Sequence, residues 1–188
     1  MIIHNFDPVF IDLGFFQIKW YSISYILGIG LGWFLAIKII KKVKEKYNFS
    51  SISITQFGDL ITYIVVGILV GGRLGYVIFY NFDYYSKNPI DILKVWQGGM
   101  SFHGGLIGVI VATFIFSKII KISFFKISDI LACVTPIGLF LGRCSNFING
   151  ELFGKATNLP WGVIFPGGGN IARHPSQIYE AILEGIIL

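Results

Sequence analysis

The sequence predicts an all-α protein, a polytopic bundle of transmembrane helices. Of its 188 residues, 54% are hydrophobic and only 13% are charged, and the mean hydropathy is +0.72. Soluble domains carry about 25% charged residues. Long runs of Ile and Leu accompany 18 Phe, 9 Tyr and 4 Trp, which excludes a disordered chain. At this length one transmembrane domain, residues 1–188, is expected.

Four apolar segments are long enough to span a bilayer, and a fifth is partial. The first is uncharged from Trp20 to Ile37, 18 residues, against about 20 for a full span. The second and fourth are each interrupted by one arginine. The four spans are expected at Lys19–Lys38, Leu60–Asn81, Val95–Ser117 and Ile130–Ile148, and the fifth begins near Gln177 and is cut off at Leu188.

The net charge of +5 indicates membrane topology rather than a nucleic-acid partner, because the lysines are grouped between apolar runs. Eight lysines lie in residues 38–46 and 118–126 and are assigned to the cytoplasm. The amino terminus is therefore expected outside. The five basic residues of the opposite side are Lys19, Lys87, Lys94, Lys155 and Arg173.

Small residues recur at a spacing of four, which predicts close packing between helices. They are Gly28 and Gly32; Gly67, Gly71 and Gly75; Gly104 and Gly108; and Gly138 and Gly142. The stretch from Asn149 to Ser176 is hydrophilic and rich in Gly and Pro, so a loop on the outer face is expected. The three histidines are too scattered to form a metal-ligand set, and we expect no metal or cofactor.

Two arginines, Arg73 and Arg143, lie inside expected spans. An ionised arginine near mid-bilayer costs about 2.5–3.5 kcal/mol on insertion scales. Counted from the expected helix starts, each lies about 20 Å up its helix, in the outer half of the membrane. His103, about 8–12 Å below the outer end of the third span, and Tyr21, at the outer start of the first, are expected in the same layer.

These arginines either form interhelical ion pairs, extend to the headgroups, or bind an anion. Glu151 is the one carboxylate that the sequence places near the layer, so one positive charge lacks an obvious protein partner. The abundant anion of a bilayer is phospholipid phosphate, which fits the forked donor geometry of guanidinium. The pattern therefore favours a lipid phosphate site.

The densest polar run extends from Gly142 to Gly154. At 100° per residue, Asn146 and Glu151 lie within about 80° of Arg143 if the helix continues, whereas Asn149 points elsewhere. The alternative is a polar helix end with a turn at Gly150.

His103 and Tyr21 each have two interpretations. A neutral imidazole that a substrate reaches past Gly104 would be a general base, and the alternative is a satisfied core histidine. Tyr21 either joins the site or anchors a helix end at the interface. Cys144 has no histidine at local spacing, so it is expected to pack rather than to act as a nucleophile.

Five segments carry a resemblance to a known family: KWY at 19–21, GGRLGYVIFYN at 71–81, VWQGGMSFHGGLIGV at 95–109, GRCSNFINGELFG at 142–154 and RHPSQIYE at 173–180. In order and spacing the chain resembles the bacterial prolipoprotein diacylglyceryl transferases over essentially its whole length. Ser145 departs from the family, which usually has Gly or Ala there.

The resemblance implies transfer of a diacylglyceryl group from phosphatidylglycerol to the lipobox cysteine thiol of a prolipoprotein, with release of glycerol phosphate. It implies a multi-pass protein of the bacterial inner membrane with its active site in the outer half of the bilayer. His103 is implied either as the base for the thiol or as a donor. The implied catalytic residues are His103, Arg143 and Tyr21, and the implied substrate-binding residues are Arg143, Asn146, Glu151, Arg73, Gly104 and Gly154.

The family has about seven spans and a further functional arginine late in the chain, so a chain ending at Leu188 is expected to be truncated at the carboxyl terminus. Glu180 and Glu184 are then expected to need partners from later helices. Two other classes stay open. One is a phospholipid-binding or transport protein that uses the Arg73/Arg143 pair without covalent chemistry, and the other is a structural subunit whose arginines pair with partner acids.

Overall fold

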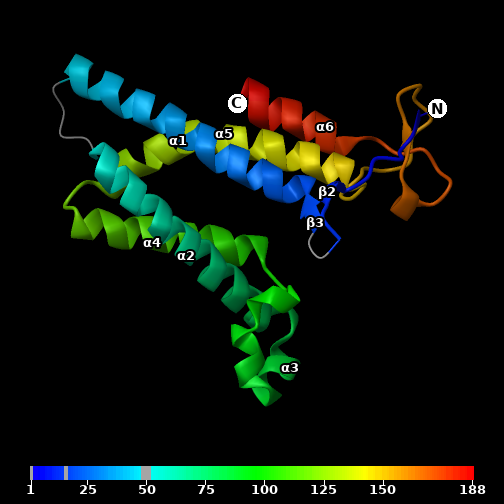
Figure 1. Cartoon of the computed structure of the whole chain (residues 1–188), viewed down its shortest axis with the longest axis horizontal. Coiled ribbons are helices and arrows are strands. Elements are labelled where there is room, and N and C mark those ends of the chain that lie inside the picture. Colours follow the sequence, from blue (N-terminus) through cyan, green and yellow to red (C-terminus); the bar gives the residue numbers. More distant parts are fainter. Residues whose placement is uncertain (1, 15–16, 48–51) are drawn as a thin grey trace. The chain divides into compact units, whose positions relative to one another are not determined.

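The computed structural model describes residues 2–14, 17–47 and 52–188. Within these ranges, four helices are long and apolar enough to cross a membrane. They are α1 (Trp20–Tyr47), α2 (Ile54–Tyr80), α4 (Phe102–Ile119) and α5 (Phe124–Ile148) (Figure 1). The all-α transmembrane class and its four complete spans are thereby confirmed.

The third helix begins seven residues later than the hydropathy indicates, at Phe102 rather than at Val95. Gly98 and Gly99 have φ values of +83° and +82°, a left-handed conformation that ends regular helix and suits glycine. Ser101 then caps α4, because its Oγ accepts a hydrogen bond from the Gly104 N–H at 3.2 Å. The expectation that His103 lies about 8–12 Å along this helix is therefore wrong, because His103 is its second residue.

The second and fourth helices begin earlier than expected, at Ile54 and Phe124. In α2 the reason is a capping box: Ser53 Oγ accepts from the Gln56 N–H, and Gln56 Oε1 accepts from the Ser53 N–H. Such polar first turns lie outside any hydropathy window.

Short elements connect these helices. The strand β1 (Ile2–Ile3) pairs in parallel with β4 (Val163–Ile164), and β2 (Val9–Asp12) pairs antiparallel with β3 (Gln17–Lys19). The region expected as an outer loop thus holds one strand of a two-stranded sheet. The short helices are α3 (Phe82–Lys87), η1 (Pro89–Leu93), η2 (Val95–Gln97), η3 (Pro166–Gly168), α6 (Ser176–Glu180) and η4 (Ala181–Ile187).

The chain forms two compact units. The first unit comprises Met1–Lys38 and Leu131–Leu188, and the second comprises Ile39–Ile130. Each is described by itself.

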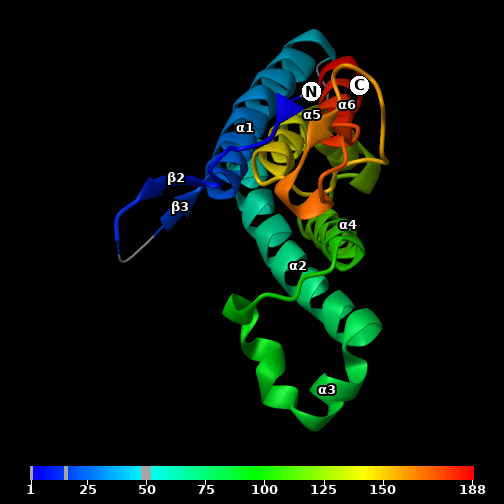
Figure 2. The ribbon, with the colours of Figure 1, turned by 90° about the vertical axis from the view of Figure 1, so that its right-hand side faces the viewer.

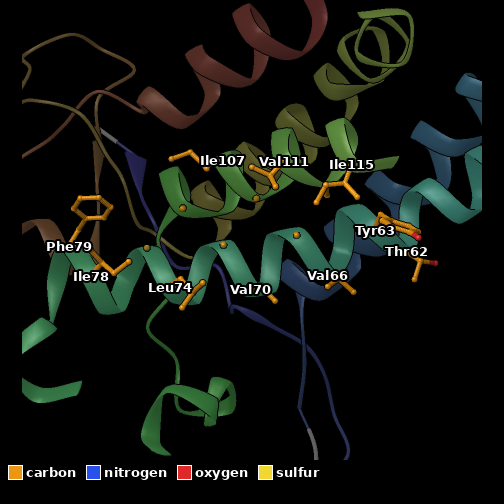
Figure 3. Close-up of a pocket in the computed structure, with 16 residues that line it drawn as sticks. Thr62, Tyr63, Val66, Val70, Leu74, Ile78, Phe79, Ile107, Val111 and Ile115 are labelled. Atoms are coloured by element: carbon orange, nitrogen blue, oxygen red, sulfur yellow. The ribbon is translucent and has the colours of Figure 1, made fainter. Parts of the chain in front are cut away.

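In the second unit, α2 and α4 cross at glycines. A Cβ atom added at Gly67 would lie 2.5 Å from the Gly108 oxygen and 2.9 Å from Ala112 Cβ, and one at Gly75 would lie 2.8 Å from Gly104 Cα. The predicted close packing of these helices is confirmed. Along the crossing runs an apolar groove of about 600 Å³. Figure 3 shows the side chains of both helices that line it, among them Val70, Leu74 and Ile107.

In the first unit, α1 lies beside α5, as Figure 1 shows. A Cβ atom on Gly28 would lie 3.4 Å from Gly138 Cα, so the close packing expected at Gly28 is confirmed. Gly142 has no described neighbour within 4 Å of its added Cβ, and its predicted packing role is wrong. The carboxyl-terminal helix, η4, packs on the side of α5 that faces away from α1 (Figure 1). A Cβ atom added at Gly185 would lie 2.5 Å from Phe140 Cβ.

Candidate active site

A network of three predicted site residues lies in the first unit. Asn146, which is buried near the end of α5, donates from Nδ2 to Tyr21 Oη at 2.6 Å and to Glu151 Oε1 at 2.9 Å. Tyr21 is the second residue of α1. The amide therefore holds a phenol and a carboxylate side by side. Asn146 and Glu151, which were expected to share a face with Arg143 on a continuing helix, are in contact here.

The route by which Glu151 reaches this network differs from the prediction. Helix α5 ends at Ile148, and Gly150 has a φ of +66°, so the helix does not continue. Instead the chain turns back, and the Glu151 N–H donates to the Asn146 carbonyl at 3.1 Å. Asn149 was predicted to point elsewhere, and this is wrong, because its Nδ2 donates to Glu151 Oε1 at 3.3 Å.

Arg143 lies one helical turn before Asn146 and contacts two carboxylates. Its Nη2 lies 2.8 Å from Glu180 Oε2, and its Nε lies 3.6 Å from Glu184 Oε2. Glu151 was expected to be the one nearby carboxylate, and Glu180 and Glu184 were expected to need later helices. Both expectations are wrong, because residues 37 and 41 positions further along the sequence return to α5. The Arg143 side chain is 28% exposed, so an anion can reach it.

Ser145, the residue that departs from the family pattern, is buried and joins the two helices. Its hydroxyl lies within hydrogen-bond distance of Ser24 Oγ and 3.4 Å from the Trp20 carbonyl. The hydroxyl is thus satisfied between α5 and α1, which explains why a serine is tolerated here.

Arg73 lies in the second unit, near the end of α2, and is only 3% exposed. Its guanidinium makes five hydrogen bonds, the number of N–H groups that it has. All go to backbone carbonyls of the segment that precedes α4, shown as an open loop in Figure 2. The acceptors are the carbonyls of Asp91, Ile92, Lys94, Gly98 and Gly99.

Arg73 therefore follows none of its three predicted modes, because it neither pairs with an acid, nor extends to solvent, nor keeps an N–H for a phosphate. The carboxylate of the same loop is engaged elsewhere. Asp91 lies 2.6 Å from Lys94 Nζ and accepts from Tyr84 Oη at 2.7 Å. These hydrogen bonds, that from Lys94 first, hold the pKa of Asp91 below its usual value.

Substitution of Arg73 is expected to loosen this loop. Arg73→Ala leaves five carbonyls without their donor, and Arg73→Lys supplies at most three N–H groups. We expect amide hydrogen exchange in residues 88–101 to rise at least tenfold in the alanine variant and less in the lysine variant, with α5 unchanged. Unaltered exchange in this segment would show that Arg73 does not hold it.

His103 also lies in the second unit, in the first turn of α4, and its side chain is exposed. It is thus accessible rather than a satisfied core histidine.

Gly104 is buried against Gly71 and Gly75 of α2, and Gly154 donates its N–H to the His174 carbonyl at 2.9 Å. Both glycines serve packing in this structure, since an added Cβ would meet neighbouring backbone.

Fold and site together define a multi-pass membrane protein in which a partly exposed, ion-paired arginine lies one helical turn from a polar network. The family model "Prolipoprotein diacylglyceryl transferase" matches residues 8–188. Phosphatidylglycerol–prolipoprotein diacylglyceryl transferases from Rickettsia canadensis (strain McKiel) and Rickettsia felis (strain ATCC VR-1525 / URRWXCal2) are 54% and 52% identical over 188 residues, all of this chain and 71% of each relative. The protein from Rickettsia rickettsii (strain Sheila Smith) is 53% identical over the same span. The chain belongs to the prolipoprotein diacylglyceryl transferase family and is a transferase.

Proposed function

We propose that the chain transfers the diacylglyceryl group of phosphatidylglycerol to the cysteine thiol of a prolipoprotein lipobox. The bond between the diacylglyceryl carbon and the phosphate oxygen breaks, and a carbon–sulfur bond forms. The thiol loses its proton, and glycerol phosphate leaves with the electron pair of the broken bond. The observation that carries the proposal is the accessible Arg143 on the same helix as Asn146, which holds Tyr21 and Glu151 together.

In this proposal Arg143 holds the lipid phosphate. The guanidinium pairs with two carboxylates, Glu180 and Glu184, and these contacts with anionic groups support the assignment. The phosphate would take the place of one of them. Because negative charge grows on the phosphate as the bond breaks, a fixed cation here stabilises the transition state more than the bound lipid.

The other residues have supporting roles. Asn146, Tyr21 and Glu151 would orient the headgroup, whose hydroxyls suit a carboxylate acceptor. His103 would assist removal of the thiol proton. We place the site in the outer half of the bacterial inner membrane, with the amino terminus outside, because the lysine-rich connections belong to the opposite side.

The function is tested by complementation in bacteria that are depleted of their own prolipoprotein diacylglyceryl transferase. Two proteins are expressed: the 188-residue chain, and a chimera that adds the part of the Rickettsia canadensis relative outside the matched region. A mobility shift of a lipoprotein precursor with either protein supports the proposal. Stable insertion of both proteins without any shift contradicts it.

A phospholipid-binding or transport protein is the other candidate function. Such a protein would bind the lipid with Arg73 and Arg143 and would form no covalent bond. The five carbonyl partners of Arg73 argue against this role for the pair, because they leave no N–H for lipid.

His103→Gln is expected to lower the turnover number by about 10²–10⁴-fold, the usual contribution of a general base, and to change lipid affinity little. Glutamine keeps a polar side chain but cannot take up a proton. The measurement is the turnover number and the Michaelis constant for phosphatidylglycerol in the two proteins. If His103→Gln raises the Michaelis constant and leaves turnover unchanged, His103 positions a substrate instead.

A further inference from the structure

The loop that carries Glu151 is fastened to the segment that leads into α6. The Gly154 N–H donates to the His174 carbonyl at 2.9 Å, and the His174 N–H donates to the Lys155 carbonyl at 3.0 Å. These backbone bonds bring residues 174–177 alongside residues 151–155. Side chains of the second segment can then reach the carbonyl groups of the first.

Two side chains do so, on both sides of a strained residue. Leu152 has a φ of +54°, a left-handed conformation that is unfavourable for a residue with a Cβ. Gln177 Nε2 donates to the carbonyl of Glu151, and Ser176 Oγ donates to the carbonyl of Leu152 at 2.8 Å. Gln177 is only 1% exposed, so solvent does not compete for its Nε2 hydrogen bond, and among the described residues its Oε1 has no hydrogen-bond partner.

From this geometry we infer that Gln177, assisted by Ser176, is a positioning residue for Glu151. The inference rests on the proposed function, in which the Glu151 carboxylate orients the lipid headgroup. Without the Gln177 amide, the Glu151 carbonyl loses its buried donor and Leu152 relaxes from the left-handed region. The backbone then rotates, and the carboxylate leaves Asn146, which holds it at 2.9 Å.

The test is the kinetics of Gln177→Met, which keeps the size of the side chain and removes its donor. We expect the Michaelis constant for phosphatidylglycerol to rise so that kcat/KM falls about tenfold, equivalent to about 1.4 kcal/mol, while kcat changes less than threefold. The matched control is Tyr179→Phe. The Tyr179 hydroxyl forms hydrogen bonds with Trp161 and His174. It forms none with Glu151 or Leu152. The control should stay within twofold of the unaltered protein.

A double-mutant cycle with Glu151→Gln separates positioning from general destabilisation. If Gln177 acts through Glu151, adding Gln177→Met to Glu151→Gln lowers kcat/KM by less than twofold further. A second tenfold loss, or no loss from Gln177→Met alone, overturns the inference. If Gln177→Met fails to fold, the cycle is repeated with the milder Ser176→Ala. This variant alone is expected to lower kcat/KM about threefold, and adding it to Glu151→Gln should again cause less than a twofold further loss.

Failure of the proposed function gives a different result. If the unaltered protein transfers lipid but the cycle is additive, only the role of Gln177 is wrong. If the unaltered protein transfers nothing, the proposed function fails. The double-mutant cycle is then measured as the affinity of each variant for phosphatidylglycerol vesicles. Non-additive losses of affinity from Gln177→Met and Glu151→Gln support the inference, and additive losses overturn it.

Discussion

Arg143→Ala is expected to lose about 10²–10³-fold in turnover, comparable with removal of a donor that stabilises transition-state charge, while the protein still inserts. The arginine is expected to hold a phosphate whose charge grows as the bond to the diacylglyceryl carbon breaks. Arg143→Lys should recover little, because lysine supplies the charge without the planar fork. The measurement is single-turnover transfer to a precursor peptide, with insertion checked by protease protection.

The ion pair with Glu180 provides the matched control for this substitution. Glu180→Gln removes the charge of the same 2.8 Å ion pair from the other side and leaves the guanidinium in place. If Arg143 only joins α5 to the carboxyl-terminal helix, both substitutions should harm transfer equally. We expect instead that Glu180→Gln keeps or strengthens binding of phosphatidylglycerol, because a competing carboxylate is gone. Equal losses in the two variants would refute a phosphate-binding role for Arg143.

The second large effect is expected at the crossing of α2 and α4. Gly67→Val places its Cβ 2.5 Å from the Gly108 carbonyl oxygen, which belongs to a helix backbone and cannot turn away as a side chain can. Overpacking usually costs about 1–3 kcal/mol, and a backbone clash lies at the upper end. We therefore expect the free energy of unfolding in detergent to fall by about 3 kcal/mol.

Gly58→Val is the matched control, since it makes the same change in the same helix. A Cβ atom at Gly58 has no neighbour within 4 Å among the described residues, so this variant reports only the helix propensity of valine. Its free energy of unfolding should change by less than about 1 kcal/mol. If the two variants unfold alike, the glycines do not set the approach of α2 and α4.

The sequence was sufficient for the parts of the fold that depend on composition and spacing. Apolar runs of about 20 residues indicated the four spans, and glycines spaced by four indicated close packing between helices, which α2 and α4 show. The helix starts could not be read from hydropathy, because local hydrogen bonds and backbone conformation decide them. The Ser53 capping box and the left-handed Gly98 and Gly99 are the decisive examples.

The sequence indicated which residues meet in the network but not how they meet. Asn146 and Glu151 were expected on one continuing helix, whereas α5 ends at Ile148 and the turn at Gly150 brings Glu151 back to Asn146. Glu180 reaches Arg143 only through tertiary packing of the carboxyl-terminal helix. The partners of Arg73 are backbone carbonyls, which every residue has and no motif marks. The side-chain type of Arg73 therefore suggested that it binds lipid. Its hydrogen bonds oppose this role, because every N–H group of the guanidinium already has a carbonyl acceptor.

The most direct measurement of the central claim is mass spectrometry of a precursor peptide. The peptide, with one lipobox cysteine, is incubated with the protein in phosphatidylglycerol vesicles, using the 188-residue chain and the chimera in parallel. The account predicts that the cysteine gains the mass of one diacylglyceryl group, that an equal amount of glycerol phosphate appears, and that a peptide with serine in place of cysteine gains nothing. Phosphatidylglycerol that binds to Arg143 without any gain in peptide mass would contradict the account and favour a lipid-binding or transport protein.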